Sequence, residues 1–237
     1  MHWHICSSCR ENCGCDNIKL SIKELSFFYP GNADKELILQ DVNWQINHPG
    51  IISIEGENGS GKTTLMKLLS SLLELKEGSI MLDEKKVGSD AYKKSMGYIM
   101  DSPILFDDLT GTEHMEVFCE LWEMAPAERE LYQANVYEYA EKLNLSKYLC
   151  NKVRTYSLGT KYKLFYILTV SRKPTLLLLD EPFNALDFRS QEIAKEILSE
   201  CAKNAIVILS SHQKELIEKL SQKRFVINQK RIEELRQ

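Results

Sequence analysis

Residues 51–65 read IISIEGENGSGKTTL, and the residue types change along this segment in three steps. The β-branched start, residues 51–54, predicts a buried strand, and the apolar spacing from Leu65 onward predicts a helix. Between them the chain is rich in glycine. A turn with few side chains can point its backbone N–H groups at an anion, and the following helix adds the positive end of its dipole. The segment therefore predicts a strand, a turn and a helix that together bind phosphate.

The glycine-rich turn matches the pattern G-x-x-x-x-G-K-[ST] from Gly56 to Thr63. In this pattern Lys62 reaches the β and γ phosphates of a nucleotide, and the hydroxyl of Thr63 holds Mg²⁺. An accidental match is expected in about one chain in a hundred of this length, so we prefer this interpretation to a glycine turn that only closes a strand–helix unit. The residues expected to bind the nucleotide here are Glu57, Asn58, Gly59, Ser60, Gly61, Lys62, Thr63 and Thr64.

A second motif, LLLLDEP, ends in two adjacent carboxylates, Asp180 and Glu181. The leucine run is short and apolar enough for a central parallel strand, and the carboxyl end of such a strand lies beside the phosphate loop in an open α/β sheet. The Asp180 carboxylate can then ligate the Mg²⁺ that Thr63 also contacts. Glu181 is a candidate to orient and deprotonate the water that attacks the γ phosphate. The alternative is a solvated turn without a catalytic role.

Periodicity assigns most of the other segments. The sequence alternates from Ile18 to a Pro-Gly turn signal, and a second strand is predicted over 38–46; we expect these two strands to form an antiparallel edge of the main sheet. Further strands are predicted over 79–82, 96–100, 176–179 and 205–209, with a hairpin over 225–232. Helices are predicted over 62–75, 112–124, 127–143, 157–170, 190–201 and 214–220.

Composition restricts the class of protein further. The 237 residues are 43% hydrophobic and 27% charged, as in ordinary soluble globular proteins. A formal charge of −4 and a pI near 5.8 offer no basic excess for nucleic acid, so nucleic acid is not expected as a partner. No apolar run is long enough to span a bilayer, and the first residues lack the apolar core of a signal peptide. We therefore expect a cytosolic chain that reaches a membrane only through a partner.

Seven cysteines are unevenly spread along the chain. In a reducing cytosol the three in the body are most simply core fillers. The first 17 residues, MHWHICSSCRENCGCDN, show no helical or strand periodicity and are predicted to be a separate extension. Their cysteines offer soft ligands for zinc or an iron–sulfur cluster, although the spacing matches no common site, and a tail without metal is the preferred interpretation. These cysteines are Cys6, Cys9, Cys13 and Cys15.

The motifs together resemble those of the ATP-binding subunits of ABC transporters, over residues 18–237. The likeness follows the family's order: 56–63 resembles the Walker A loop, YSLGT at 156–160 the signature that is commonly LSGGQ, 176–181 the Walker B strand with its catalytic glutamate, NALD at 184–187 the D-loop, and His212 the switch histidine.

This resemblance implies a role for several further residues. Tyr29 would stack on adenine, unless it is simply a core aromatic with its two phenylalanine neighbours. His212 would contact the γ phosphate and hold Glu181 and the attacking water in line. Ser157 and Gly159, at a helix N-terminus, would bind the nucleotide held by a second copy, so that two copies pair head to tail.

Two departures from the family pattern affect what the resemblance implies. Asp101 stands where the family carries a glutamine that contacts Mg²⁺ and the attacking water. A carboxylate can still ligate Mg²⁺, but its charge near the γ phosphate is expected to slow or alter the gating of hydrolysis. In the signature, Leu158 and Thr160 replace a glycine and a glutamine. The form YSLG resembles the variant in exporters of antibiotics, bacteriocins and other peptides.

We therefore predict an α/β fold with a P-loop NTPase core, a mostly parallel sheet, an antiparallel β edge and a helical subdomain at about 103–170. The predicted function is ATP hydrolysis that powers an ABC transporter, by a homodimer docked on transmembrane permease subunits at the cytoplasmic face of the membrane. The predicted exporter would carry a peptide or drug-like compound. Two alternatives remain: a nearly inactive regulatory ATP-binding subunit, and a nucleotide-gated ABC protein outside transport.

Overall fold

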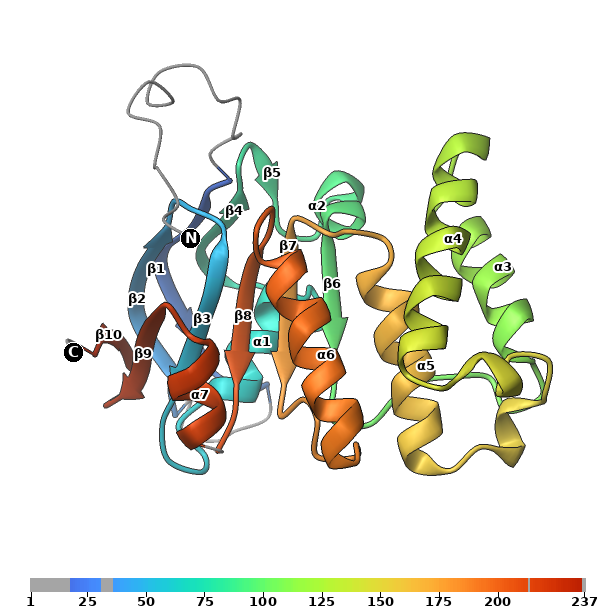
Figure 1. Cartoon of the computed structure of the whole chain (residues 1–237). Coiled ribbons are helices and arrows are strands. Elements are labelled where there is room, and N and C mark those ends of the chain that lie inside the picture. The colour runs from blue at the N-terminus through green and yellow to red at the C-terminus, as the bar shows by residue number, and fades with distance from the viewer. Residues whose placement is uncertain (1–17, 31–35, 213, 236–237) are drawn as a thin grey trace, which may run out of the picture.

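Over residues 18–30, 36–212 and 214–235, which the computed structural model describes, the strands form two sheets (Figure 1). The larger has the order β10-β9-β3-β8-β7-β6, and all its neighbouring pairs except β9 and β10 are parallel. The smaller has the order β2-β1-β4-β5 and is antiparallel. The strands are β1 Leu20–Phe27, β2 Leu39–Ile46, β3 Gly50–Glu55, β4 Glu77–Leu82, β5 Lys85–Lys86, β6 Met96–Ile99, β7 Leu176–Asp180, β8 Ile206–Ser210, β9 Lys223–Asn228 and β10 Arg231–Glu234.

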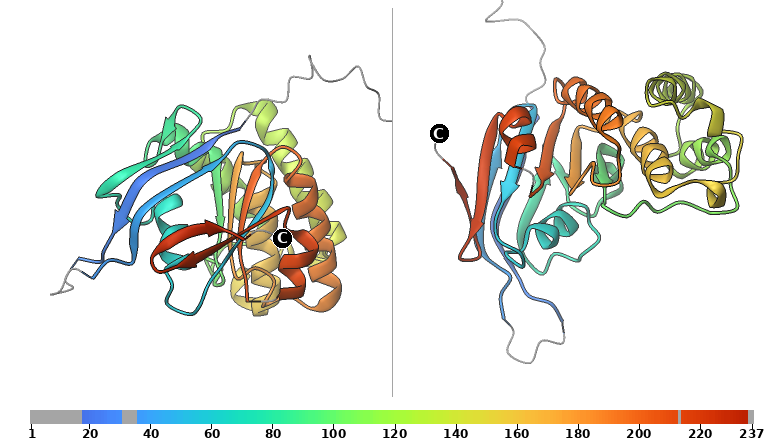
Figure 2. Two further views of the ribbon diagram at one scale, coloured as in Figure 1. Left: turned by 90° about the vertical axis from the view of Figure 1, so that its left-hand side faces the viewer. Right: turned by 60° about the horizontal axis from the view of Figure 1, so that its bottom comes forward.

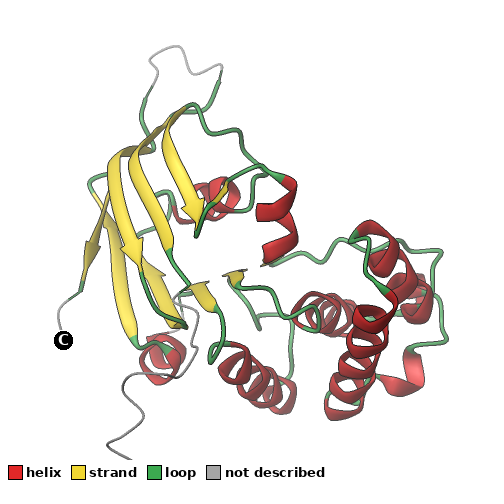
Figure 3. Cartoon of the chain, turned by 90° about the horizontal axis from the view of Figure 1, so that it is seen from above, coloured by secondary structure: helices red, strands yellow, loops and turns green. Residues whose placement is uncertain are grey.

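Helices cover both faces of the larger sheet. The helix α1 lies between the two sheets (Figure 2), whereas α6 and α7 cover the opposite face (Figure 1). The helices α3, α4 and α5 stand together to one side of the sheets, and we call them the helical lobe (Figure 3). The bounds are α1 Lys62–Leu69, α2 Asp90–Ser95, α3 Gly111–Leu121, α4 Pro126–Lys142, α5 Leu158–Val170, α6 Phe188–Cys201 and α7 Lys214–Leu220, with short 3₁₀ turns at Ser146–Tyr148 and Val153–Thr155. None of the described helices has the length and apolarity needed to cross a membrane.

The strand β7 lies between β8 and β6 and is covered on both faces, which explains why the leucine run is apolar throughout. Leu176 and Leu178 pack into the core shared with α1 and the smaller sheet, and Leu177 and Leu179 pack into the core shared with the helical lobe and α6. Because successive side chains of a strand point to opposite faces, a strand buried on both faces needs apolar residues at every position. All four leucines are fully buried.

The predicted fold class is confirmed, and three features of the elements differ from the prediction. The antiparallel strands from the N-terminal part of the chain form a sheet of their own, not an edge of the main sheet, because β1 pairs with β2 and β4. The helix predicted over 62–75 ends at Leu69, where Ser70 closes the last turn. The short helix α2 was not predicted; its N-cap is Ser89, whose hydroxyl accepts a hydrogen bond from the Tyr92 N–H. The tail cysteines lie outside the described residues.

The parallel strands β3, β8, β7 and β6 all end at the same edge of the larger sheet, which is the lower edge in Figure 1. The loop that leads from β3 into α1 lies at this edge, and α5 begins at the same edge farther along the molecule. Residues that follow these strands are therefore brought close together although they are far apart in sequence.

Candidate functional site

The turn between β3 and α1 has the open form that anion binding requires. Gly56, Gly59 and Gly61 have φ values of 150°, 82° and 106°, which side chains rarely tolerate. At Gly56 a Cβ would lie 2.6 Å from Ser60 Oγ and 3.0 Å from the Ile227 carbonyl oxygen, so glycine is required there by space as well. The N-cap of α1 is Gly61 and makes no side-chain hydrogen bond to the first turn. The first N–H groups of α1 are thus left for a ligand.

Lys62 lies across this turn. Its Nζ donates hydrogen bonds to the carbonyl oxygens of Gly56 at 2.7 Å and Glu57 at 2.9 Å. Burial lowers the pKa of Lys62, and the nearby Glu181 and Asp180 carboxylates oppose this by favouring the charged form. The lysine therefore stands between the turn and the two carboxylates of the second motif.

The carboxylates lie at the carboxyl end of β7 as predicted: Asp180 is its last residue, and Glu181 follows it. The Ser210 hydroxyl, at the end of β8, donates to Asp180 Oδ1 at 2.5 Å. Glu181 has a φ of 49°, in the left-handed region, and its N–H donates to the Ser210 carbonyl at 3.0 Å. A left-handed residue that is not glycine is uncommon and is held by its surroundings. Here the end of β8 fixes both the Asp180 side chain and the Glu181 backbone.

His212 follows β8 and faces Glu181. Its backbone N–H donates to Glu181 Oε2 at 3.4 Å, and its Nε2 lies 3.4 Å from Oε1 without hydrogen-bond alignment. The Glu181 side chain is 21% exposed and that of His212 is 56% exposed. The histidine is therefore the more exposed partner of the pair.

These groups surround one pocket of about 340 Å³. Tyr29 is at its rim: its hydroxyl lies 3.1 Å from Thr64 Oγ1, and its ring meets the Phe27 ring edge-on at 5.1 Å. Tyr29 therefore packs on a core aromatic and is still partly exposed. A core role and stacking on adenine are compatible with this position. The pocket is lined by Tyr29, Ile38, Asn58, Gly59, Gly61, Lys62, Thr63, Thr64, Asp180, Glu181 and His212.

The donors in this pocket fit a magnesium ion. The Thr63 hydroxyl and the Asp180 carboxylate are hard oxygen ligands of the kind that Mg²⁺ prefers. Among the described residues no group of three or more His, Cys, Asp and Glu side chains gathers as a metal site. An ion held by Thr63 and Asp180 would therefore take its other ligands from phosphate oxygens and water, as Mg²⁺ commonly does.

The signature residues do not reach this pocket. Ser157 is the N-cap of α5, and its hydroxyl accepts a hydrogen bond from the Thr160 N–H and lies 2.8 Å from Thr160 Oγ1. Leu158 projects into solvent and is 63% exposed. Gly159 packs against the D-loop, because a Cβ there would lie 2.8 Å from the Ala185 carbonyl oxygen. The start of α5 is thus a second, open site on the same edge of the molecule (Figure 1).

Asp101 is exposed and lies beyond the end of β6, outside the residues that line the pocket. It is near Tyr98 of β6: burial, followed by the Asp180 and Asp101 carboxylates, raises the pKa of Tyr98. The sequence interpretation missed Tyr98 and Ser210 as neighbours of the site. The two serines in ILSSH at 208–212 were the only sequence indication of such a donor. The β7–β8 register is needed to show that Ser210 is the one beside Asp180.

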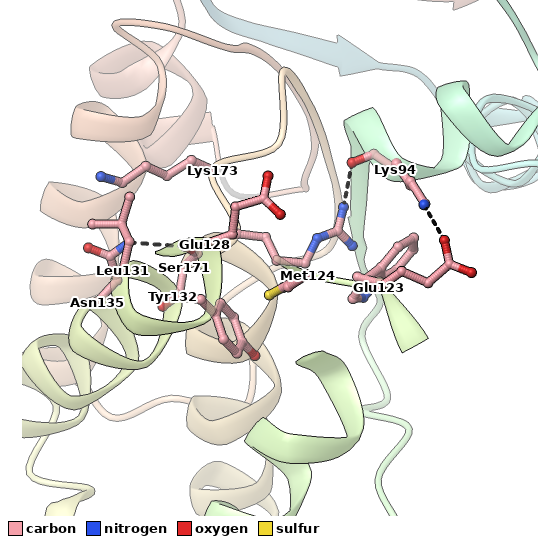
Figure 4. A pocket seen from close by; sticks show the side chains of 11 residues that line it. Lys94, Glu123, Met124, Glu128, Leu131, Tyr132, Asn135, Ser171 and Lys173 are labelled. Atoms are coloured by element: carbon pink, nitrogen blue, oxygen red, sulfur yellow. Dashed lines mark hydrogen bonds and ion pairs between the residues drawn. The ribbon is translucent and has the colours of Figure 1, made fainter. Parts of the chain in front are cut away.

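A second cavity, of about 420 Å³, lies where the helical lobe meets α2 and β6 (Figure 4). The Arg172 guanidinium donates to the carbonyl oxygens of Lys94 and Met96 and stacks over the Trp122 ring at 3.6 Å. Lys94 in turn pairs with Glu123 at 2.6 Å. These contacts join the end of α5 and the turn after α3 to the start of β6, so the cavity marks the joint between the lobe and the sheet.

Comparison with known proteins agrees with this geometry. A family model described as "ABC transporter" matches residues 39–184, which is more than half of the chain. The chain therefore belongs to the ABC transporter family, as an ATP-binding domain. The solved "Structure of ATP binding subunit of ABC transporter" superposes with a TM-score of 0.82 at 26% identity and covers 91% of this chain and 90% of that chain.

Two relatives show the range of the family. The cytochrome c biogenesis ATP-binding export protein CcmA of Reclinomonas americana is 30% identical over 187 residues, 77% of this chain and 81% of its own length. The spermidine/putrescine import ATP-binding protein PotA of Borreliella afzelii (strain PKo) is also 30% identical over 187 residues, 77% of this chain and 52% of its own length. The chain thus spans about half of PotA, and its relatives include both an export and an import protein.

Proposed function

We propose that this chain hydrolyses ATP to power an ABC transporter, as a subunit on the cytoplasmic face of a membrane. The observation that carries the proposal is the convergence of Lys62, Asp180, Glu181 and His212 on one pocket beside a glycine-rich turn. The family supports ATP binding and Mg²⁺. The residue roles below are part of the proposal, and the geometry of the pocket supports them. We take residues 18–237 as the ATP-binding domain, with a helical subdomain at about 103–170.

The residues divide the reaction among them. The N–H groups of residues 57–64 would hold the phosphates, and Lys62 would leave the carbonyls of Gly56 and Glu57 to pair with the β and γ phosphates. Mg²⁺, held by Thr63 and Asp180, would neutralise charge on those phosphates. Glu181 would accept a proton from the attacking water, and His212 would keep that carboxylate and the γ phosphate in line.

A second copy would complete each site. The pocket is open to solvent above the phosphate loop, and its own chain supplies no group from the start of α5. The Ser157 hydroxyl and the N–H groups at the start of α5 would form an anion site for the nucleotide of the other copy. ATP would therefore join two copies, the phosphate loop of one facing Ser157 and Gly159 of the other, and hydrolysis would let them separate.

The partner in transport would be a transmembrane permease. We place its contact between the loop after Asp101 and the helical lobe, because Ile104 and Phe106 of that loop expose apolar side chains. Among the described residues, Ile104 is 70% exposed, more than most apolar side chains. Export of a peptide or drug-like compound is our proposal from the YSLG signature; the relatives leave both directions open.

The experiment is a phosphate-release assay on the purified chain with Mg-ATP, with Lys62→Met as the inactive reference. Steady release that Lys62→Met abolishes would support the proposal. The pairing of copies is tested with Glu181→Gln, which should form an ATP-dependent dimer in sedimentation velocity. A chain that stays monomeric with Mg-ATP, with Glu181 disabled and the permease present, would contradict the composite site.

A nearly inactive regulatory subunit is the second candidate. The observation that favours it is Asp101, a carboxylate where the family has a glutamine, on a loop outside the pocket. Tight binding of ATP without measurable release of phosphate in the same assay would select this candidate.

A further inference from the structure

The Asp180 carboxylate has a side-chain hydroxyl from each neighbouring strand on its own face of the sheet. Asp180 and Ser210 are paired in the β7–β8 register, and the Ser210 hydroxyl donates to Asp180 Oδ1. On the other side, Tyr98 of β6 is paired with Leu178, two residues before Asp180 on the same face of β7. The Tyr98 phenol is therefore a near neighbour of the Asp180 carboxylate, on the same face of the sheet.

All three side chains point toward α1. Leu178, which shares their face of the sheet, packs into the core that contains α1, and Tyr98 packs against the same core. The first residues of that helix are Lys62 and Thr63. The hydroxyls of Ser210 and Tyr98 therefore approach the carboxylate from the sheet, whereas the predicted second magnesium ligand approaches from the helix.

Both hydroxyls are suited to act as lasting donors. Ser210 is fully buried, so its hydroxyl has no competing water, and Asp180 Oδ1 is the acceptor within reach. Tyr98 is partly buried, and a phenol O–H can donate to a neighbouring carboxylate. A carboxylate that ligates a metal is commonly oriented by hydrogen bonds of this kind, and their loss typically weakens metal binding by about 10–100-fold.

We propose that Ser210 and Tyr98 are positioning residues, which fix the rotation of the Asp180 carboxylate so that its remaining lone pairs face the metal held with Thr63. The inference rests on the proposed function, because it takes the pocket to bind Mg-ATP. It adds two residues that neither the sequence motifs nor the pocket lining include. Ser210 fixes Oδ1 directly, and Tyr98 restrains the group from the opposite strand.

The test measures metal binding separately from nucleotide binding. Mn²⁺ replaces Mg²⁺ as a spectroscopic probe, and its affinity for the complex of the full chain with a non-hydrolysable ATP analogue is measured by electron paramagnetic resonance. Affinity for the analogue alone is measured in EDTA. Ser210→Ala should weaken Mn²⁺ binding about tenfold and leave analogue affinity in EDTA unchanged. Tyr98→Phe, which removes only the hydroxyl, should weaken Mn²⁺ binding about threefold.

Ser53→Ala is the matched control. Ser53 is also a fully buried serine on the larger sheet, paired with the residue before Ser210, but its hydroxyl has no hydrogen-bond partner. Its variant should bind Mn²⁺ as the unaltered chain does. Equal Mn²⁺ affinity for Ser210→Ala and Ser53→Ala would overturn the inference and leave the proposed function intact. Failure of the unaltered chain to bind the analogue, with or without metal, would overturn both.

Discussion

The phosphate-loop pocket and the start of α5 lie on one edge of the molecule but differ in how their side chains are held. In the pocket, Lys62, Asp180 and Glu181 are partly or largely buried; Lys62 bonds to the phosphate loop, and the two carboxylates bond to residues distant in sequence. At the start of α5, Ser157 bonds only within its own turn, and Leu158 is exposed. One region is assembled by contacts within the fold of a single chain, and the other is exposed at its surface.

Because their side chains are held differently, the pocket and the start of α5 should contribute differently to the reaction. Groups that are buried and mutually bonded can act in chemistry without rearrangement, because their orientation is fixed before a ligand arrives. Exposed groups at a helix start contribute binding only when another surface covers them. We therefore expect substitutions in the pocket to affect the chemical step and substitutions at α5 to affect the association of copies.

The largest expected effect is that of Glu181→Gln. The variant keeps the shape of the side chain but cannot accept a proton, and a general base is commonly worth about 10²–10⁴-fold in rate. Phosphate release should fall by at least about a hundredfold, while ATP binding is retained. Glu192→Gln, on the exposed surface of α6 and paired with Lys195, is the matched control. Turnover at the normal rate in Glu181→Gln would remove this residue from the mechanism.

Gly159→Ala, at the start of α5, should show the next largest effect. A Cβ at Gly159 would meet the Ala185 carbonyl at 2.8 Å, and this backbone atom has to move for the variant to fold. We expect about a tenfold lower rate of ATP hydrolysis, because displacement of the D-loop against the start of α5 would weaken the association of copies. The variant should bind nucleotide as a monomer with unchanged affinity, because the phosphate loop is distant.

Leu158→Gly gives the contrast to that variant. Leu158 touches little of its own chain, so its removal should change the monomer's stability by no more than about 1 kcal/mol, the cost of glycine in a helix. Its rate of hydrolysis should stay within about threefold. A rate loss as large as that of Gly159→Ala would show that the leucine itself, and not the glycine packing, matters at this end of α5.

The same contrast explains what the sequence could predict. The phosphate loop and the motif around Asp180 are local patterns, and the apolar run of β7 places them at one edge of the sheet, so their meeting could be expected. The donors from Ser210 and Tyr98 could not, because they depend on strand neighbours and register that periodicity does not encode. The smaller sheet was missed for the same reason: strand pairing between distant segments is a tertiary property.

The position of Asp101 in the fold differs from the position that the sequence pattern suggests. The sequence placed it next to the γ phosphate by its likeness to a family glutamine. In the folded chain it is exposed, beyond the end of β6 and outside the pocket lining. A loop after a strand has no periodicity to fix its path, so its distance from the site could not be derived from the pattern. Its role as a ligand of Mg²⁺ stays a prediction.

Asp101→Gln tests that prediction with an intermediate effect. If Asp101 approaches the nucleotide during the cycle, removing its charge should raise the rate of hydrolysis about threefold, because a negative group near the γ phosphate opposes the developing charge. Asp108→Asn, an exposed carboxylate on the following loop that pairs with Arg154, is the control. Kinetics of Asp101→Gln equal to those of the unaltered chain would make Asp101 a bystander.

The smallest expected effect concerns the stability of the N-terminus of α6, which an ion pair connects to α5. Asp187 is the N-cap of α6: hydrogen bonds from the Ser190 N–H and hydroxyl, with a smaller effect of Lys163, lower the pKa of Asp187 to about 2. Because this pKa is below that of the unfolded chain, the cap stabilises the fold above about pH 4. That contribution is lost as the pH falls from about 4 toward 2.

Asp187→Ala should therefore lower the free energy of unfolding by about 1 kcal/mol at pH 7, the usual value of an N-cap. In urea titrations the difference from the unaltered chain should shrink as the pH is lowered from 5 to 3, since protonation removes the same interaction from the unaltered chain. Asp187→Asn keeps a capping side chain without a charge and should lose about half as much. A pH-independent difference would mean that the α6 cap acts through shape alone. In that case the ion pair of Asp187 with Lys163 at 3.4 Å, which connects α6 to α5, would contribute nothing measurable, as is common for exposed pairs.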